Sequence, residues 1–343
     1  MDKKKVFVTG ASGLVGTHLV YQLAQQGYAV KALLRNLSSL NTVREVFGYY
    51  TKDPSALIEK IEWTEGDVLD YYGLCDIMDD VKHVYHTAAL VSFQSSDKEQ
   101  MMATNIRGTA NVVNACLESG VEKLCHVSSV AALGHRDDGM PVDEQTPWKY
   151  DSMVSAYAIS KFFAETEVWR GIEEGLTAVI VNPTVVMGPG NWQRGSSSIM
   201  TAIYHGLCFY PSGSTGYVDV RDVVNVMIAL TESPVCNEKF ILNSENLSYK
   251  TTFEMMSTAL GLKTRWKEAP SFLLSLGCAL DTIRSFIFRT SPRLTRELIL
   301  AGQAHVAYSN KKITETCGWH FIPIQESIAH MAQCFLTNPP SLL

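Results

Sequence analysis

The sequence predicts an α/β protein built on a doubly wound parallel sheet, with helices on both faces and a second, smaller lobe that is mainly helical. Three observations predict this fold. Short apolar runs alternate with amphipathic stretches through the first half of the chain, a glycine-rich turn joins the first strand to the first helix, and the alternation ends after residue 183. Strands that alternate with helices form parallel sheets, whose ligands bind beyond the carboxyl ends of the strands.

The expected strands are short and apolar; in order they are residues 6–9, 29–34, 61–65, 81–87, 123–128 and 178–183. The helical period is clearest in residues 14–26 and 104–120, and a glycine closes both segments. Segments rich in glycine and serine follow at 188–198 and 212–216. Residues 222–230 and 240–243 are expected to return to the sheet as a helix and a strand, and from about residue 244 the sequence is mainly helical.

Composition excludes several classes of function. The chain has 343 residues, 46% of them hydrophobic, and its formal net charge of -6 argues against a nucleic-acid-binding surface. Its eight cysteines form no CxxC pair and its nine histidines show no HExxH spacing, so we expect free thiols in a reducing, cytoplasmic compartment and no metal site. The apolar segment 272–288 contains Asp281 and Arg284 and is expected to be a partly buried helix, or alternatively one on a membrane surface, but no membrane span.

Residues 9–16 read TGxxGxxG between the first expected strand and the first expected helix. Gly10 allows a tight turn, Gly13 lets a pyrophosphate approach the backbone, and Gly16 lets the helix pack closely on the strand. The first N–H groups of the helix offer a positive dipole end to phosphates. The context therefore predicts a dinucleotide site of the Rossmann type rather than a simple turn, with the loop residues Gly10, Ser12, Gly13, Leu14, Val15 and Gly16 in contact with the cofactor.

The second expected strand leads into Arg35 and not into a carboxylate. NAD sites usually place an Asp or Glu there to hold the ribose 2′-hydroxyl, but no acidic residue occurs between residues 17 and 44. A guanidinium suits a phosphate, so Arg35 favours NADP(H) over NAD(H) unless it is an ordinary solvated side chain. Asp67 and Val68, after the third strand, are expected to contact the adenine.

Tyr157 and Lys161 have the i,i+4 spacing that places two side chains on one helical face. A tyrosine pKa of about 10 must fall by about three for the phenol to act as a base near neutrality, and an ammonium about 4 Å away at an effective dielectric near 20 supplies that stabilisation. Such pairs are common on helix surfaces, but the end of the fifth strand adds a hydroxyl. We expect Ser129, rather than Ser128, to orient a substrate oxygen.

These elements, in this order, resemble the extended short-chain dehydrogenase/reductase family, which forms the NAD(P)-dependent epimerase/dehydratase superfamily. The resemblance covers nearly the whole chain. Besides TGxxGxxG and YxxxK it includes motifs at residues 66–68 (GDV), 84–89 (VYHTAA), 105–109 (NIRGT), 128–129 (SS), 182–184 (NPT), 188–190 (GPG) and 217–222 (YVDVRD). The arginine after the second strand, the NPT motif and the 217–222 segment are most similar to the branch of dihydroflavonol reductase, cinnamoyl-CoA reductase and 3β-hydroxysteroid dehydrogenase.

The resemblance implies a role for each motif. Ser129, Tyr157 and Lys161 match the catalytic triad, and Asn105 matches an asparagine that supports a proton-relay water near the lysine. The further cofactor-binding residues expected are Thr87, Ala88, Ala89, Pro183 and Val185. Relatives often dimerise through helices that flank the active site, here residues 104–120 and 157–170, so a homodimer is expected.

Two lobes with a cleft between them are expected. Residues 1–182 and 217–243 would form the dinucleotide-binding domain, and residues 184–216 and 244–343 the substrate-binding lobe. The loops at the cleft carry apolar and aromatic side chains, which favour a partly apolar substrate unless these side chains form the core of the smaller lobe. The candidates are Val91, Phe93, Ala131, Met187, Trp192 and Phe209.

The predicted function is that of an NADP(H)-dependent oxidoreductase, which interconverts a carbonyl and a secondary alcohol on a small molecule with Tyr157 as acid/base. A nucleotide-sugar epimerase or dehydratase that recycles its cofactor is one alternative. Epimerases usually carry an arginine where this chain has Thr215, although Arg194 can replace it. The other alternative is a non-enzymatic dinucleotide sensor or scaffold. The intact Tyr157–Lys161 pair argues against this alternative.

Overall fold

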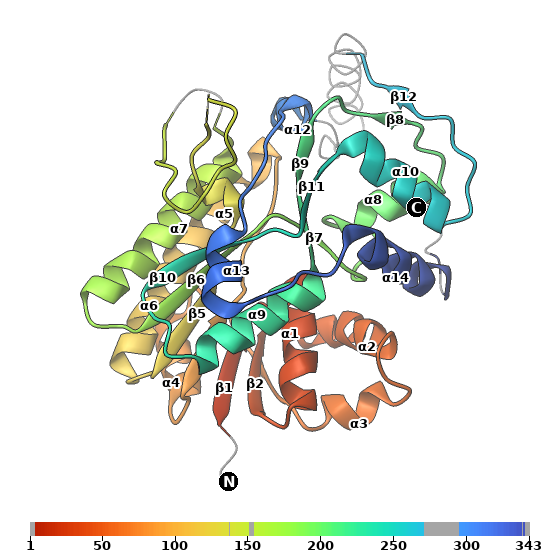
Figure 1. Cartoon of the computed structure of the whole chain (residues 1–343). Coiled ribbons are helices and arrows are strands. Elements are labelled where there is room, and N and C mark those ends of the chain that lie inside the picture. Colours follow the sequence, from red (N-terminus) through yellow and green to blue (C-terminus); the bar gives the residue numbers. More distant parts are fainter. Residues whose placement is uncertain (1–3, 137, 151–153, 271–294, 338, 340–343) are drawn as a thin grey trace.

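The computed structural model in Figure 1 describes residues 4–136, 138–150, 154–270, 295–337 and 339. The helix expected at residues 272–288 lies outside the described residues. Within the described ranges, no helix combines the length and the apolar character needed to cross a membrane. In the same ranges, no group of three or more His, Cys, Asp or Glu side chains is placed to hold a metal ion.

Seven strands form the central sheet in the spatial order β10-β6-β5-β4-β1-β2-β3, and every neighbouring pair is parallel. Their bounds are β1 Lys5–Thr9, β2 Ala29–Leu34, β3 Glu62–Glu65, β4 His83–His86, β5 Lys123–Val127, β6 Ala178–Pro183 and β10 Glu238–Leu242. The chain first builds outward from β1 to β3 and then returns to β4 on the other side of β1. Open parallel sheets bind their ligands at this switch point. The predicted doubly wound parallel sheet is confirmed.

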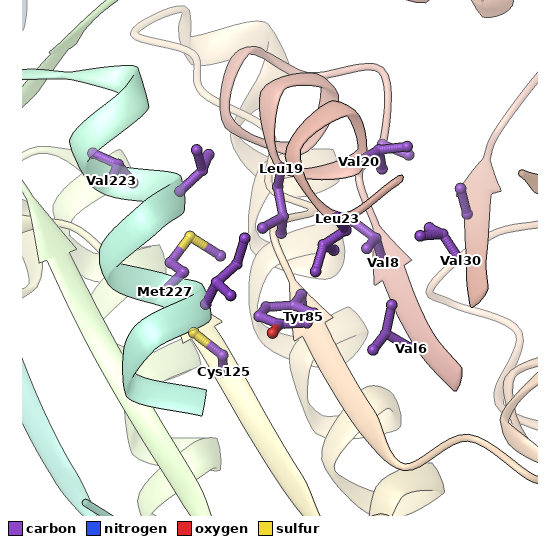
Figure 2. Packing of buried hydrophobic residues seen from close by; sticks show 14 of the residues in the cluster. Val6, Val8, Leu19, Val20, Leu23, Val30, Tyr85, Cys125, Val223 and Met227 are labelled. Atoms are coloured by element: carbon purple, nitrogen blue, oxygen red, sulfur yellow. The ribbon is translucent and has the colours of Figure 1, made fainter. Parts of the chain in front are cut away.

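Helices cover both faces of the sheet (Figure 1). One face packs against α1 Leu14–Gln25, α2 Leu40–Gly48, α3 Pro54–Ile58 and α9 Val220–Glu232; the other packs against α4 Tyr71–Met78, α6 Gly108–Glu118 and α7 Ala156–Glu173. Successive strand residues alternate between the two cores, as the side-chain period of a strand requires. In Figure 2, Tyr85 of β4 lies among Leu23 of α1 and Met227 of α9, and all three side chains are fully buried.

The second lobe has its own hydrophobic core. A three-stranded sheet is formed by β7 Val185–Met187, β9 Ser214–Asp219 and β11 Glu245–Ser248, and β8 Phe209–Tyr210 pairs with β12 Lys267–Glu268. The helices of this core are α8 Ser197–Tyr204, α10 Tyr249–Ala259 and α14 Ile324–Thr337. Its mainly helical character is confirmed, whereas these short strands were not predicted, because so few residues show little periodicity. The other elements include α5 Lys98–Met102, α12 Arg296–Gln303, α13 Lys311–Cys317 and the single turns at Leu37–Ser39, Ser95–Asp97 and Val130–Ala132.

The helix predicted at residues 104–120 is not continuous. It begins with a π-helical turn, Ala103–Arg107, and only then continues as α6. A π turn widens the helix by one residue and is found frequently at functional sites. The turn carries Asn105, whose side chain reaches the backbone of the loop that follows β4.

Candidate active site

The glycine turn lies at the carboxyl end of β1, and two of its glycines are required by close packing. Gly10 has a φ of +70°, and a Cβ there would lie 2.6 Å from the amide nitrogen of Ala88. At Gly16, a Cβ would lie 2.1 Å from the carbonyl oxygen of Gly10. Any larger residue would therefore push α1 and the β4 loop away from the turn.

Gly13 differs from its neighbours because the space beside it is open. It is the N-cap of α1 with an extended backbone and no side-chain cap, and a Cβ there would meet only the carbonyl oxygen of Gly10, at 3.2 Å. The first turn of α1 therefore presents backbone N–H groups and the positive end of the helix dipole beside an open face. This geometry fits the pyrophosphate of a dinucleotide, with Ser12, Leu14 and Val15 on the same turn.

The loop after β4 is fastened to the end of β1, so the two sides of the switch point are held together. Thr87 Oγ1 donates to the carbonyl oxygen of Thr9 at 2.6 Å, and the amide of Ala88 donates to Thr9 Oγ1 at 3.3 Å. The Thr9 hydroxyl also pairs with His86 Nδ1 at 2.7 Å. Thr87 and Ala88 thus lie against the glycine turn, while Ala89 is exposed just beyond them.

Arg35 follows β2 as an exposed side chain, and no hydrogen bond or ion pair joins it to another described residue. The next turn is ordered by Asn36, which accepts a hydrogen bond from the amide of Ser38 at 2.8 Å. A carboxylate that the sequence reasoning missed is also present: Glu65, at the end of β3, accepts from the amide of Leu37 at 3.2 Å. The parallel register of Leu34 with Glu65 brings the ends of β2 and β3 together, and no local pattern in the sequence predicts this pairing.

The two residues expected at the adenine lie after β3. Asp67 is exposed and accepts a hydrogen bond from the amide of Leu69 at 2.9 Å, whereas Val68 is buried. A Cβ on Gly108 would lie 2.7 Å from Val68 Cγ2, so α6 packs directly on this loop. Val68 is therefore a packing residue beneath the loop, and Asp67 is the member of the pair that solvent or a ligand reaches.

The structure brings Ser129, Tyr157 and Lys161 together at the end of β5. The Ser129 hydroxyl is close enough to Tyr157 to act on the pKa of its phenol, and Ser129 Oγ accepts a hydrogen bond from the amide of Ala131 at 3.1 Å. Lys161 is 2% exposed, and its Nζ donates to the carbonyl oxygen of Val127 at 2.9 Å. Ser128 is used elsewhere, because its hydroxyl donates to Glu165 at 2.7 Å. Of the two neighbouring serines, Ser129 is the one placed beside the phenol.

The pKa shifts in the chain differ from the simple expectation that Lys161 lowers the pKa of Tyr157. Burial raises the pKa of Tyr157, and the nearby Ser129 hydroxyl offsets only part of that effect. Burial also lowers the pKa of Lys161 to about 8, while Glu165 acts in the opposite direction. For both groups desolvation is the largest effect on the pKa, because burial penalises the charged form of each. The phenol is therefore protonated at neutral pH and set to donate a proton.

The amide of Asn105 is fully engaged by protein groups. Its Oδ1 accepts from the amide of Leu90 at 2.7 Å, and its Nδ2 donates to the carbonyl oxygen of Leu90 at 3.0 Å and to Ser160 Oγ at 2.9 Å. Ser160 in turn donates to the carbonyl oxygen of Tyr157 at 2.7 Å. Asn105 thus clamps the loop after β4 to the helix that carries Tyr157. Its expected support of a relay water stays a prediction.

The expected substrate residues fall into two groups. Phe93 lies edge-on to Tyr157, with the ring centroids 6.0 Å apart, and Val91 is exposed on the same loop. Met187 and Trp192 instead belong to the buried core of the second lobe, where the indole of Trp192 donates to the Tyr49 hydroxyl at 2.9 Å. Phe209 is exposed in β8 and pairs with Lys267 of β12. Of the remaining positions, Ala131 follows Ser129, Pro183 ends β6 and is buried, and Val185 begins β7 half-buried.

A sheet of this strand order, with a glycine turn at its switch point and a Ser–Tyr–Lys cluster beside it, defines a Rossmann-fold enzyme that uses a nicotinamide dinucleotide. A model of the NAD dependent epimerase/dehydratase family matches residues 6–242 of the chain. The chain belongs to the NAD dependent epimerase/dehydratase family.

Similar proteins include several reductases. The chain is 27% identical to a putative dihydroflavonol 4-reductase of Synechocystis sp. over 336 residues, which cover 96% of this chain and 94% of that protein. It is 31% identical to cinnamoyl-CoA reductase 1 of Arabidopsis thaliana over 255 residues, 70% of each chain. The crystal structure of gox2253 superposes with a TM-score of 0.80 at 30% identity, covering 98% of this chain and 99% of that one.

Sugar-nucleotide enzymes share the fold. The crystal structure of UDP-glucose 4-epimerase from Thermotoga maritima superposes with a TM-score of 0.75 at 19% identity, and the match covers 97% of this chain and 99% of that one. The family and these relatives make the chain an NAD(P)-dependent enzyme of the reductase, epimerase or dehydratase kind, whose substrates are small molecules.

Proposed function

We propose that the chain is an NADP(H)-dependent oxidoreductase, in which Tyr157 exchanges a proton with the oxygen of a substrate that alternates between carbonyl and secondary alcohol. The observation that carries this proposal is the position of the Tyr157 phenol, close to Ser129 and Lys161 at the sheet edge that also holds the glycine turn. The bound dinucleotide supplies or accepts the hydride.

The chain's own residues provide the proton chemistry. Tyr157 donates its hydroxyl proton to the substrate oxygen in the direction of reduction, and the raised pKa of its phenol keeps that proton in place at neutral pH. Ser129 offers a second hydroxyl to the same oxygen. Lys161, held by the carbonyl oxygen of Val127, places a positive charge behind the phenol, which stabilises the phenolate that forms as the proton leaves.

The dinucleotide would be held by the glycine turn, the loop after β4 and the ends of β2 and β3. Arg35 supports NADP(H), because its exposed guanidinium lacks a protein partner among the described residues and suits a phosphate bidentately. The Glu65 carboxylate at the end of β3 would repel such a phosphate, and its hydrogen bond from the Leu37 amide does not cancel that repulsion, so NADP(H) binding depends on a stronger attraction to Arg35. Arg35 is therefore the residue that decides between the two cofactors.

A partly apolar or aromatic substrate fits the loop after β4. Phe93 offers an aromatic wall next to Tyr157, and Val91 is 58% exposed one step away. The domains at residues 1–182 with 217–243 and at 184–216 with 244–343 would close around this substrate. A homodimer through residues 104–120 and 157–170 is supported by Phe163, a large side chain of α7 that is 47% exposed.

The test mixes purified protein with NADPH or NADH and a panel of aliphatic and aromatic ketones and aldehydes, and follows the absorbance of reduced nicotinamide. Net, substrate-dependent oxidation of NADPH supports the proposal. Conversion of a nucleotide sugar without net cofactor oxidation would instead identify an epimerase. Dinucleotide binding with no turnover of any carbonyl compound or sugar nucleotide would favour a sensor.

A further inference from the structure

Helix α7 carries a buried carboxylate that the proposed chemistry does not use. Glu165 lies one helical turn after Lys161 and is 4% exposed. A carboxylate taken out of water is costly unless it is paired and hydrogen-bonded. Its presence in this position therefore calls for a compensating set of donors.

Four donors converge on Glu165. Its Oε2 accepts from the Ser128 hydroxyl at 2.7 Å and from Asn182 Nδ2 at 2.8 Å. Its Oε1 accepts from the Trp169 indole at 3.3 Å and from Lys239 Nζ at 3.2 Å. These partners come from the end of β5, the end of β6, α7 itself and β10, so a single carboxylate ties the catalytic helix to three adjacent strands.

The same network reaches the backbone that presents Ser129. Asn182 Nδ2 donates to the carbonyl oxygen of Ser129 at 3.0 Å as well as to Glu165. Ser128, the neighbour of Ser129, donates to the same carboxylate oxygen. The backbone that presents Ser129 and the helix that carries Tyr157 are therefore held to each other through Glu165.

We propose that Glu165 is a positioning residue of the catalytic cluster, whose carboxylate, balanced by Lys239, fixes Ser129 against α7 and stabilises the charged form of Lys161. This inference rests on the proposed function for its catalytic meaning, but the ionic coupling itself needs no substrate. Lys239 controls how much of the carboxylate's negative charge acts on Lys161, because it is the only cation among the described residues that forms an ion pair with Glu165.

The groups that face Lys161 support this coupling. Tyr157 is uncharged at neutral pH, and the imidazoles of His86 and His126 are neutral because burial lowers the pKa of each. Glu165 is thus the anion that raises the pKa of Lys161, against the effect of burial. Glu165 also lines, together with Lys239 and Glu144, a cavity of about 230 Å³.

The test measures the titration of Lys161 directly, by NMR of the full chain labelled with ¹³Cε-lysine, without cofactor or substrate. The Lys161 signal is the one lost in Lys161→Met. Removing the anion in Glu165→Gln should lower the titration midpoint of Lys161 by about one pH unit, whereas removing the cation in Lys239→Met should raise it by about one. Lys239→Arg should restore the native midpoint.

Lys82→Met is the matched control, since Lys82 lies just before β4, pairs with the exposed Glu122 and should leave the midpoint unchanged. A purely structural role for Glu165 predicts no shift, or shifts of the same sign, in Glu165→Gln and Lys239→Met; either result overturns the proposal. If Glu165→Gln does not fold, an unchanged midpoint in Lys239→Met is sufficient to overturn it. Opposite shifts in a protein that reduces no carbonyl compound would instead refute the proposed function and leave the coupling intact.

Discussion

Replacing Gly13 by alanine separates dinucleotide binding from stability. The backbone of Gly13 has φ -77° and ψ 169°, a conformation that alanine adopts freely, and the new methyl group would meet only the Gly10 carbonyl oxygen, at 3.2 Å. Alanine is a poorer N-cap than glycine but loses less chain entropy on folding, so the two effects oppose each other and the free energy of unfolding should change by less than about 1 kcal/mol. If a pyrophosphate approaches this backbone, the methyl group costs about one charge-assisted hydrogen bond, which corresponds to binding about 10- to 100-fold weaker.

Replacing Gly16 of the same turn by alanine should instead lower the stability of the fold. In Gly16→Ala the methyl group would lie 2.1 Å from the Gly10 carbonyl oxygen and 2.7 Å from Thr87 Oγ1. Helix α1 would therefore have to move away from the turn, and the packing between them would be lost in part. We expect a loss of about 1–3 kcal/mol in the free energy of unfolding. Gly48→Ala is the matched control, because nothing lies within 4 Å of a Cβ there.

Both quantities are measurable on the same preparations. Urea unfolding followed by circular dichroism gives the stability, and the fluorescence of NADPH during titration gives the affinity. Gly13→Ala should unfold like the wild type and bind NADPH weakly, whereas Gly48→Ala should bind NADPH like the wild type and be at least as stable, because alanine is favoured over glycine in a helix. A Gly13→Ala protein that binds NADPH with native affinity would refute the assignment of the glycine turn to the pyrophosphate.

Three further results are expected. Arg35→Ala should weaken NADPH binding by about 10- to 100-fold and leave NADH binding nearly unchanged in the same titration. Equal losses of NADPH and NADH affinity would show that Arg35 contacts no phosphate. Burial lowers the pKa of Lys161 to about 8, so the kcat/KM for carbonyl reduction should fall above about pH 8 as Lys161 loses its proton. A kcat/KM that stays level to about pH 10 would contradict the role of the charged Lys161 in catalysis. Burial raises the pKa of Asp222 to about 6, so ionisation of this carboxyl disfavours the folded state. Between about pH 4 and pH 7 the wild type should therefore lose about 3 kcal/mol of unfolding free energy relative to Asp222→Asn. Urea midpoints with the same pH dependence in both proteins would exclude this effect of Asp222.

The sequence predicted the parts of the molecule that depend on local periodicity. The strands of the central sheet and the glycine turn follow from apolar runs and from a backbone that tolerates no Cβ at Gly10 and Gly16. The spacing of Tyr157 and Lys161 placed them on one helical face, and the strand end placed Ser129 beside them. These features are set by residues close together in the chain.

The features that the sequence did not reveal depend on long-range contacts. Trp192 was a candidate for the substrate cleft, but it is buried against Phe335 of α14, more than a hundred residues further along the chain. Glu165 has the i,i+4 spacing to Lys161 that the sequence shows, but its proposed role in positioning depends on Asn182 of β6 and Lys239 of β10, which are distant in the sequence. The raised pKa of Tyr157 likewise depends on burial, which spacing alone does not measure.

Stopped-flow reduction of the best carbonyl compound by NADPH, compared between the wild type and Tyr157→Phe, tests the central claim most directly. Removing one hydroxyl should slow the chemical step by about 10²- to 10⁴-fold and leave NADPH affinity nearly intact, because the phenol donates the proton and the glycine turn holds the cofactor. Reduction by Tyr157→Phe at the wild-type rate would contradict the account.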